Sequence, residues 1–262
     1  MFGDEPALKP EELTYQRMLA GDPIEVAEQA RQILKEKPLI EYYDDVLIEA
    51  LKLAQADSDR GHLDEERKQR IRDVVAEMLE DLEVHEDIAS DANTVGSVED
   101  TKHSNPIVSH SMIVPEEWRL SKSILCIPGR DLLGEAFALI VAQLLTKEGL
   151  VARVEQSNAL SKARLSNLDT DDVGLICLCF VGGSTPAQIG YAIRRLRRKM
   201  PTAFILLALI GHTEKEELKA TLGYGSIQHT LADTRNEILK MVQRSEEADR
   251  VRPVLSMAAQ SV

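Results

Sequence analysis

The stretch Ser123-Ile-Leu-Cys-Ile-Pro-Gly-Arg-Asp-Leu-Leu-Gly-Glu135 decides the fold of this chain. A short apolar run ends at Pro128-Gly129, and the apolar residues that follow Asp131 recur every three or four positions. This pattern predicts a buried strand, a tight turn and a long helix that ends near Gly149. Ligands of open parallel sheets bind beyond the carboxyl ends of the strands, so we expect residues 129–134 to lie at a ligand edge.

The alternation of strand and helix continues to residue 245. Further strands are expected at residues 150–155, 173–181, 203–210 and 225–228, and further helices at 159–164, 186–199, 214–221 and 232–244. Five strands joined by crossover helices predict an α/β domain with a five-stranded, doubly wound parallel sheet of the flavodoxin-like kind.

The amino-terminal part of the chain has helical periodicity only. Four amphipathic segments between residues 10 and 86, separated by short Gly- and Pro-containing breaks, predict a small helical bundle. Periodicity is lost after residue 87, where Ser, Asp, Asn and Thr dominate. We therefore divide the chain into a helical bundle (1–88), a flexible linker (89–121), the doubly wound α/β domain (122–245) and a tail without pattern (246–262).

Composition excludes several classes of protein. The net charge of −13 argues against nucleic-acid binding, which needs a basic face. Cys126, Cys177 and Cys179 all fall in expected strands, which favours reduced core thiols over a disulfide framework. The apolar runs are much shorter than the ~20 residues of a membrane helix. We expect a cytoplasmic protein.

The first candidate ligand site is the turn after the first strand, formed by Gly129, Arg130, Asp131 and Gly134. Its two glycines have the spacing of a phosphate loop, but Glu135 stands where nucleotide hydrolysis requires a lysine. Arg130 and Asp131 can orient a ligand. The alternative is that Asp131 caps the helix and Arg130 is an exposed side chain.

A second candidate is Gly182-Gly183-Ser184-Thr185, which follows the third strand and opens the next helix. Its backbone amides can bind an anion, or Ser184 or Thr185 can serve as an ordinary helix cap. A response-regulator receiver needs an aspartate at the end of this strand, and none is present there.

One basic cluster stands out, formed by Arg194, Arg195, Arg197, Arg198 and Lys199. It can contact anionic lipid headgroups or the acidic bundle, or it can simply suit the carboxyl end of its helix. His103 and His110 lie in the linker without metal-ligand spacing around them, and we expect solvated linker residues. His212 and His229 follow the fourth and fifth strands at the ligand edge. We expect them to be loop residues and not an acid or base, because no nucleophile or carboxylate pair converges on them. No metal site is predicted.

The arrangement of a helical bundle before a doubly wound sheet resembles the cobalamin-binding modules of methyltransferases and of some light or redox sensors. That family has Asp-x-His-x-x-Gly after its first strand, and its histidine supplies the lower cobalt ligand. Aligned on Gly134, this chain has Gly129 at the aspartate position and Asp131 at the histidine position. The family's Ser-x-Leu would fall near residues 176–178, without the serine. The axial imidazole is therefore absent, and we expect no bound cofactor.

A second resemblance rests on four short sequence motifs. Phe2-Gly-Asp-Glu-Pro, Pro10-Glu-Glu-Leu-Thr-Tyr-Gln-Arg-Met-Leu-Ala-Gly-Asp-Pro23, Glu41-Tyr-Tyr-Asp-Asp-Val46 and Cys126-Ile-Pro-Gly-Arg-Asp131 are similar to the cytosolic carboxyl-terminal extension of proteobacterial permeases of the autoinducer-2 exporter (PerM-like) family. This resemblance implies a role in transport, either as part of a permease or as a stand-alone relative. It also implies a position at the inner face of the membrane.

Two functions follow from these observations. The first is a non-enzymatic regulatory or interaction module related to such a permease extension, with a permease domain, an anionic membrane surface or a second copy of the chain as partner. The alternative is a sensor of cobalamin or another small ligand at the carboxyl edge of the sheet. We expect no enzyme activity, because no nucleophile and base, or pair of carboxylates, converge in the predicted fold.

The linker leads to a prediction about proteolysis. Limited proteolysis should cut first between residues 87 and 107, because this segment has few apolar residues between two periodic blocks. Mass spectrometry of the first fragments should then show two protease-resistant pieces. An initial cut inside either piece would contradict the expected boundary.

Overall fold

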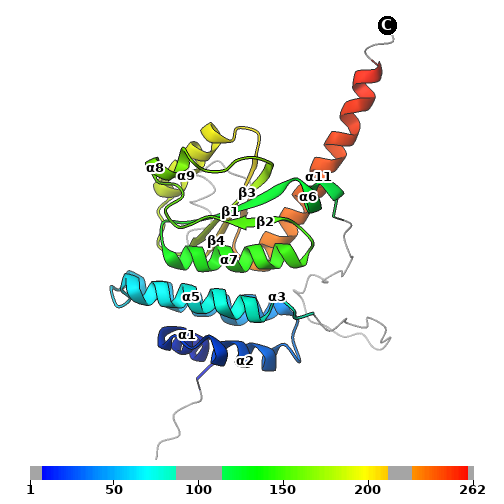
Figure 1. Ribbon diagram of the computed structural model, residues 1–262. Helices are drawn as coiled ribbons and strands as arrows, with labels where there is room; N and C mark the ends of the chain where they lie inside the picture. The colour runs from blue at the N-terminus through cyan, green and yellow to red at the C-terminus, as the bar shows by residue number, and fades with distance from the viewer. Residues whose placement is uncertain (1–7, 87–113, 212–225, 259–262) are drawn as a thin grey trace, which may run out of the picture.

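The computed structural model describes residues 8–86, 114–211 and 226–258, with side chains up to Ser245. It has an α/β architecture, as predicted, with the helical bundle stacked on one side of the α/β layers (Figure 1). The predicted helix at 214–221, His103, His110, His212 and residues 89–113 of the linker lie outside the described residues.

The bundle begins with α1 (Pro10–Ala20) and α2 (Pro23–Ile33). The next helix changes type along its length, from α3 (Leu39–Tyr42) through a π-helical turn, η1 (Tyr43–Leu47), to α4 (Ile48–Asp59). The last helix of the bundle is α5 (Glu65–Asp81), capped by Asp64. The Gly and Pro breaks of the sequence thus separate these segments as expected.

The sheet contains β1 (Ser123–Pro128), β2 (Ala152–Val154), β3 (Val173–Val181), β4 (Phe204–Ile210) and β5 (Ile227–Gln228). All pairs are parallel, and the strand order is β2-β1-β3-β4-β5. The order reverses between β1 and β3, and the crevice outside this reversal is the usual ligand position of a doubly wound sheet.

Helices cover both faces of this sheet. α7 (Leu132–Lys147) lies between the sheet and the bundle, while α8 (Lys162–Leu165) and α9 (Pro186–Lys199) lie on the opposite face (Figure 1). Side chains alternate between the two faces along each strand. On β3, Cys177 and Cys179 point into the core shared with α7 and the bundle, whereas Leu178 and Phe180 point into the core under α9.

The cysteines confirm the sequence-based prediction. Cys126, Cys177 and Cys179 are free and fully buried thiols. Burial raises the pKa of the Cys179 thiol. A buried thiol kept protonated is a core residue of low reactivity, so these side chains act by packing.

Two segments differ from the sequence-based expectations. The end of the predicted linker forms α6 (Glu116–Leu120), whose Trp118 is buried with its indole Nε1 donating to Ser245 Oγ at 3.0 Å. Gly174 permits this packing, because a Cβ there would lie 2.6 Å from the indole ring. The last helix, α11 (Leu231–Ala258), continues into the predicted tail.

Polar contacts join the bundle to the α/β layers. Arg72 on α5 donates to the carboxylate of Glu135 on α7 at 2.9 Å, and the other oxygen of Glu135 accepts from the amide of Ser157 at 2.9 Å. Tyr43 donates to the side-chain oxygen of Gln143, another α7 residue. Glu135, which occupies the position of the lysine in a phosphate loop, therefore joins the bundle to the α/β layers.

Asp44 makes a second interlayer contact from the π-helical turn. Its two carboxylate oxygens accept from the amides of Leu231 and Ala232, at 2.7 and 2.9 Å, and so cap the start of α11. A π-turn moves the residues that precede it around the helix axis, and such turns often serve a local function. Here the turn carries the carboxylate that holds a helix from the far end of the chain.

We predict that Asp44→Ala lowers the free energy of unfolding by about 1–2 kcal/mol, the usual cost of removing a helix cap. Asp45→Ala is the matched control, because its carboxylate pairs with Lys37 at the surface and is half exposed. That variant should lose less than about 1 kcal/mol. Chemical denaturation compares the two, and equal losses would show that Asp44 does not act as a cap.

Candidate functional site

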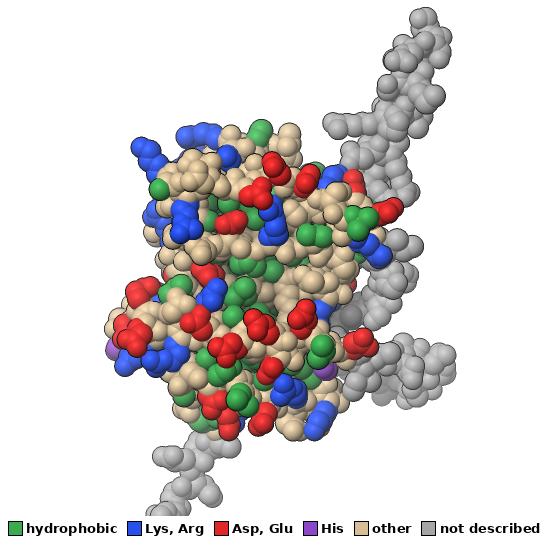
Figure 2. Space-filling view, in the orientation of Figure 1, with side chains coloured by type: hydrophobic (Ala, Val, Ile, Leu, Met, Phe, Trp, Pro, Cys, Tyr) green, Lys and Arg blue, Asp and Glu red, His purple; other side chains and the backbone are tan. Residues whose placement is uncertain are grey.

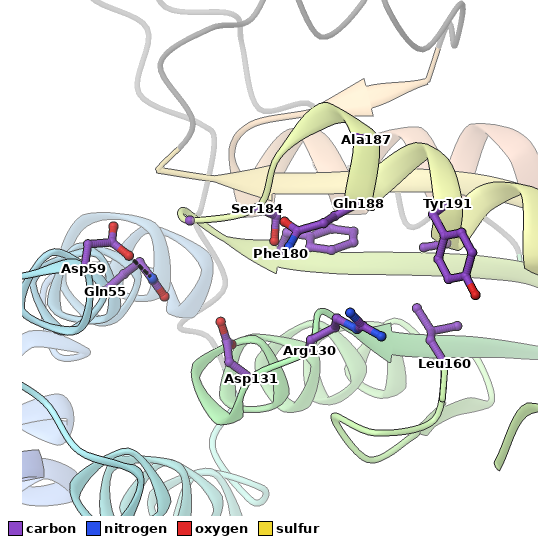
Figure 3. A pocket seen from close by; sticks show the side chains of 12 residues that line it. Gln55, Asp59, Arg130, Asp131, Leu160, Phe180, Ser184, Ala187, Gln188 and Tyr191 are labelled. Atoms are coloured by element: carbon purple, nitrogen blue, oxygen red, sulfur yellow. Dashed lines mark hydrogen bonds between the residues drawn. The ribbon is translucent and has the colours of Figure 1, made fainter. Parts of the chain in front are cut away.

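A cavity lies at the carboxyl edge of the sheet, outside the ends of β1 and β3 (Figure 3). Its volume is about 410 Å³, within the range of small-molecule sites. Five segments of the chain line it: α4, the turn after β1, the loop before α8, the end of β3 with the turn that follows, and α9. The lining residues are Gln55, Asp59, Arg130, Asp131, Leu160, Phe180, Gly183, Ser184, Ala187, Gln188, Tyr191 and Ala192.

The bundle contributes Gln55 and Asp59 to this cavity, and neither residue was among the predicted site residues. Gln55 is only 7% exposed, and its Nε2 donates to Asp59 Oδ1 at 2.7 Å. Its Oε1 is buried and has no hydrogen-bond partner among the described residues. The cavity therefore contains a buried acceptor whose donor would have to come from outside the described chain.

The turn after β3 allows α4 to come this close. A Cβ at Gly182 would lie 2.7 Å from Gln55 Cγ, and a Cβ at Gly183 would lie 2.9 Å from Gln55 Nε2. Both glycines also have positive φ angles, +48° and +55°, which other residues seldom adopt. The pair is needed both for the turn itself and for the contact between the layers.

Three of the four amides of this turn, those of Gly182, Ser184 and Thr185, are used within the chain. Gly182 donates to the Ile210 carbonyl at 2.8 Å, and Ser184 donates to the Gly182 carbonyl. Thr185 caps α9 through its hydroxyl, while its own amide donates to Gln188 Oε1 at 2.8 Å. Of the four predicted anion-binding residues, Gly183 and Ser184 line the cavity, and the ordinary helix cap is the arrangement that the structure contains.

Asp131 lines the cavity and also caps α7. One carboxylate oxygen accepts from the Gly134 amide at 2.6 Å. Burial is the main cause that raises the pKa of Asp131, and the nearby carboxylates of Glu65 and Asp59 add to it. The Gly134 amide and the ammonium group of Lys68 act in the opposite direction. The positively charged and hydrogen-bonding groups around Asp131 therefore do not offset the effect of its burial.

The two glycines of the β1–α7 turn pack against β3. The Gly129 amide donates to the Cys179 carbonyl at 2.7 Å, and a Cβ at Gly129 would lie 2.9 Å from the ring of Phe180. Gly134 similarly lies against the Gly129 amide and the Cys179 carbonyl. Neither glycine lines the cavity, whereas Arg130 does, and its side chain extends toward Leu160 (Figure 3).

The basic cluster lies on α9, and Lys and Arg side chains gather over α8 and α9 in Figure 2. Three of its members donate to loop carbonyls of the α/β domain: Arg195 to Leu160, Arg197 to Ala203 and Lys199 to Ser166. Arg194 and Arg198 are exposed. Much of the cluster therefore holds its own domain together, and contact with an anionic surface stays a prediction.

The described residues form neither a metal cluster nor a membrane-spanning helix. The ring of His229 is bonded through Nδ1 to the Leu209 carbonyl at 3.0 Å, and no histidine is among the described residues that line the cavity. Within residues 8–86, 114–211 and 226–258, no group of three or more His, Cys, Asp or Glu side chains is placed to hold a metal ion. None of the described helices is both long and apolar enough to cross a bilayer.

Comparison with known proteins supports the fold at the level of architecture. The monomethylamine corrinoid protein of Methanosarcina barkeri is similar over 88% of this chain and 98% of its own, with a TM-score of 0.50 and 9% identity. A cobalamin-binding protein from Desulfitobacterium hafniense DCB-2 gives a TM-score of 0.33 at 10% identity, over 88% of this chain and 96% of that one.

Sequence comparison adds no family. No family model and no curated protein matches the chain. The likeness to the corrinoid protein is a likeness of fold alone. The resemblance to an autoinducer-2 exporter extension has no support from these comparisons.

The contact between α4 and the Gly182-Gly183 turn generates a prediction with a built-in control. Gly182→Ala should cost about 2–4 kcal/mol of unfolding free energy, because left-handed strain and the overlap with Gln55 Cγ add together. Gly61→Ala has a comparable φ of +76° with no atom within 4 Å of the new Cβ. It should cost only the strain, about 1–2 kcal/mol. Equal losses in thermal or chemical denaturation would mean that the interlayer contact is loose.

Proposed function

We propose that this chain is a non-enzymatic sensor module that binds a small molecule in the cavity between α4 and the carboxyl edge of the sheet. The proposal rests on the buried Oε1 of Gln55, which has no hydrogen-bond partner among the described residues and belongs to a cavity at the reversal of strand order. Polar groups occupy the end near α4, and Leu160, Phe180 and Tyr191 give the other end an apolar surface.

A sensing role follows from the position of the cavity. Its lining comes from the bundle on one side and from two sheet-edge turns on the other. A ligand that touches both sides binds more tightly to the docked arrangement than to a separated one, and so favours docking. The described lining gives little support for catalysis. It offers the hydroxyls of Ser184 and Tyr191 with no histidine or lysine as base, and one of its two carboxylates, that of Asp131, caps α7.

The lining does not fit a corrinoid held by a protein nitrogen. The similar structure from Methanosarcina barkeri is that of a corrinoid protein. In this chain, Asp131 stands in the turn after β1, its carboxylate caps α7, and no imidazole is among the described residues of the lining. A carboxylate is a poor substitute for imidazole at a soft metal centre. The proposed ligand is therefore a molecule small enough for the 410 Å³ cavity.

The proposal extends to a sensor that acts beside a membrane permease. Its partner would be a permease domain, an anionic surface or a second copy of the chain. The exposed Arg194 and Arg198 are the groups available for an anionic surface.

A cavity-filling variant tests the proposal. Ala187 is an exposed cavity residue on α9, so Ala187→Trp should occupy the space without disturbing the core. We expect fragments that bind the wild-type protein in ligand-observed NMR to bind this variant at least about tenfold more weakly, since they compete with the indole for the same volume.

Ala163→Trp serves as the matched control, because Ala163 is an exposed alanine on α8 that lies outside this cavity. Fragment binding to that variant should equal binding to wild type. Equal binding to all three proteins, or binding to none of them, would contradict a ligand site in this cavity.

A further inference from the structure

The polar end of the cavity has more acceptors than donors. Asp59 and Asp131 supply carboxylates, and Gln55 supplies a carbonyl oxygen. Among the described residues of the lining, Arg130 is the one cationic side chain, and it is exposed and extends toward the apolar end (Figure 3). The ammonium group of Lys68, on α5, is already paired with Glu65 at 2.8 Å.

The orientation of the Gln55 amide is fixed by its neighbour. Its Nε2 donates to Asp59 Oδ1, and the reverse orientation would place the amide oxygen against this carboxylate oxygen. The side chain also has little freedom to turn away, because the Gly182-Gly183 backbone packs against it. Oε1 is therefore held as a buried acceptor, and a buried acceptor without a donor is unfavourable.

The side chains at the apolar end of the cavity are held in place, and they form a surface against which a ligand ring can pack. Arg195 donates to the Leu160 carbonyl at 2.6 Å, and its guanidinium lies over the Tyr191 ring at 5.4 Å from the centroid. These two contacts hold Leu160 and Tyr191 on one side of the cavity. Phe180, which is 3% exposed, forms part of the floor.

We infer that the cavity recognises a primary amine with an apolar, ring-sized body. Its ammonium group lies among Gln55 Oε1, Asp59 and Asp131, and its body lies against Leu160, Phe180 and Tyr191. An ammonium group has three donors and no acceptor, which matches three acceptors at the polar end. This inference rests on the proposed function and names the chemical class of its ligand.

An anionic ligand fits the same lining poorly. The amides of Gly182, Ser184 and Thr185 are bonded within the chain, so the amino end of α9 does not offer them to an anion. Carboxylates of Asp59 and Asp131 would also repel it. An added cation has the opposite effect, because it offsets the burial that raises the pKa of Asp131.

The test compares three probes that share a phenyl body: 2-phenylethylamine, 2-phenylethanol and 3-phenylpropionate. Each is titrated into the isotope-labelled full chain and followed by amide NMR. The amine should bind with shifts at α4 and at both turns, at least about tenfold more tightly than the alcohol or the carboxylate, because charge-assisted hydrogen bonds are stronger than neutral ones.

Variants locate the ammonium group. Asp59→Asn and Asp131→Asn should each weaken the amine about tenfold and leave the alcohol unchanged, since asparagine keeps the shape and, at position 131, the helix cap. Glu77→Gln is the control, an exposed α5 carboxylate outside the cavity lining. It should bind the amine as wild type does.

The outcomes separate this inference from the proposed function. If 3-phenylpropionate or 2-phenylethanol binds in the cavity as tightly as the amine, the amine inference is wrong and the ligand site stands. The same conclusion follows if Asp59→Asn and Asp131→Asn bind the amine unchanged. If no probe perturbs any cavity residue at millimolar concentration, both the inference and the proposed function fail.

Discussion

The close approach of α4 to the Gly182-Gly183 turn is the contact on which the site depends. It brings Gln55 from the bundle to within 2.9 Å of the space where a Gly183 side chain would be. Any larger residue in the turn would push the bundle away from the sheet edge. The cavity would then lose the wall that supplies Gln55 and Asp59, and with it most of its polar character.

The other interlayer contacts reinforce this arrangement. Glu135 and Asp44 each use both carboxylate oxygens to join segments distant in sequence, and one buried core runs from the bundle through α7 to the inner face of the sheet. The bundle is therefore part of the site. In the proposed function, ligand occupancy and docking of the bundle are linked properties.

Much of this molecule could be predicted from local patterns in the sequence. The strand, turn and helix at residues 123–147, the parallel sheet and the buried thiols follow from periodicity and turn chemistry. The capping role of Asp131 and Thr185 also follows, because the residue type and its position before a helix suffice. The general rule for parallel sheets also predicts a ligand edge at the position where the structure has its cavity.

What was missed depends on long-range contacts. Gln55 and Asp59 lie on an ordinary amphipathic helix, and nothing in their neighbours shows that they meet a turn more than 120 residues later. The partners of the basic cluster, such as the Leu160 carbonyl for Arg195, are backbone atoms that carry no sequence signal. The one available clue was Gly182-Gly183 itself, since paired glycines often mark a close approach of another segment.

The central claim is that the cavity between the bundle and the sheet edge holds an amine against Gln55. A crystal structure of the full chain soaked with 2-phenylethylamine tests it most directly. The account predicts the ammonium nitrogen within hydrogen-bond distance of Gln55 Oε1 and the phenyl ring between Phe180 and Tyr191. The account is contradicted if the cavity is closed by side chains, or if the amine binds elsewhere while Gln55 Oε1 keeps no contact with it.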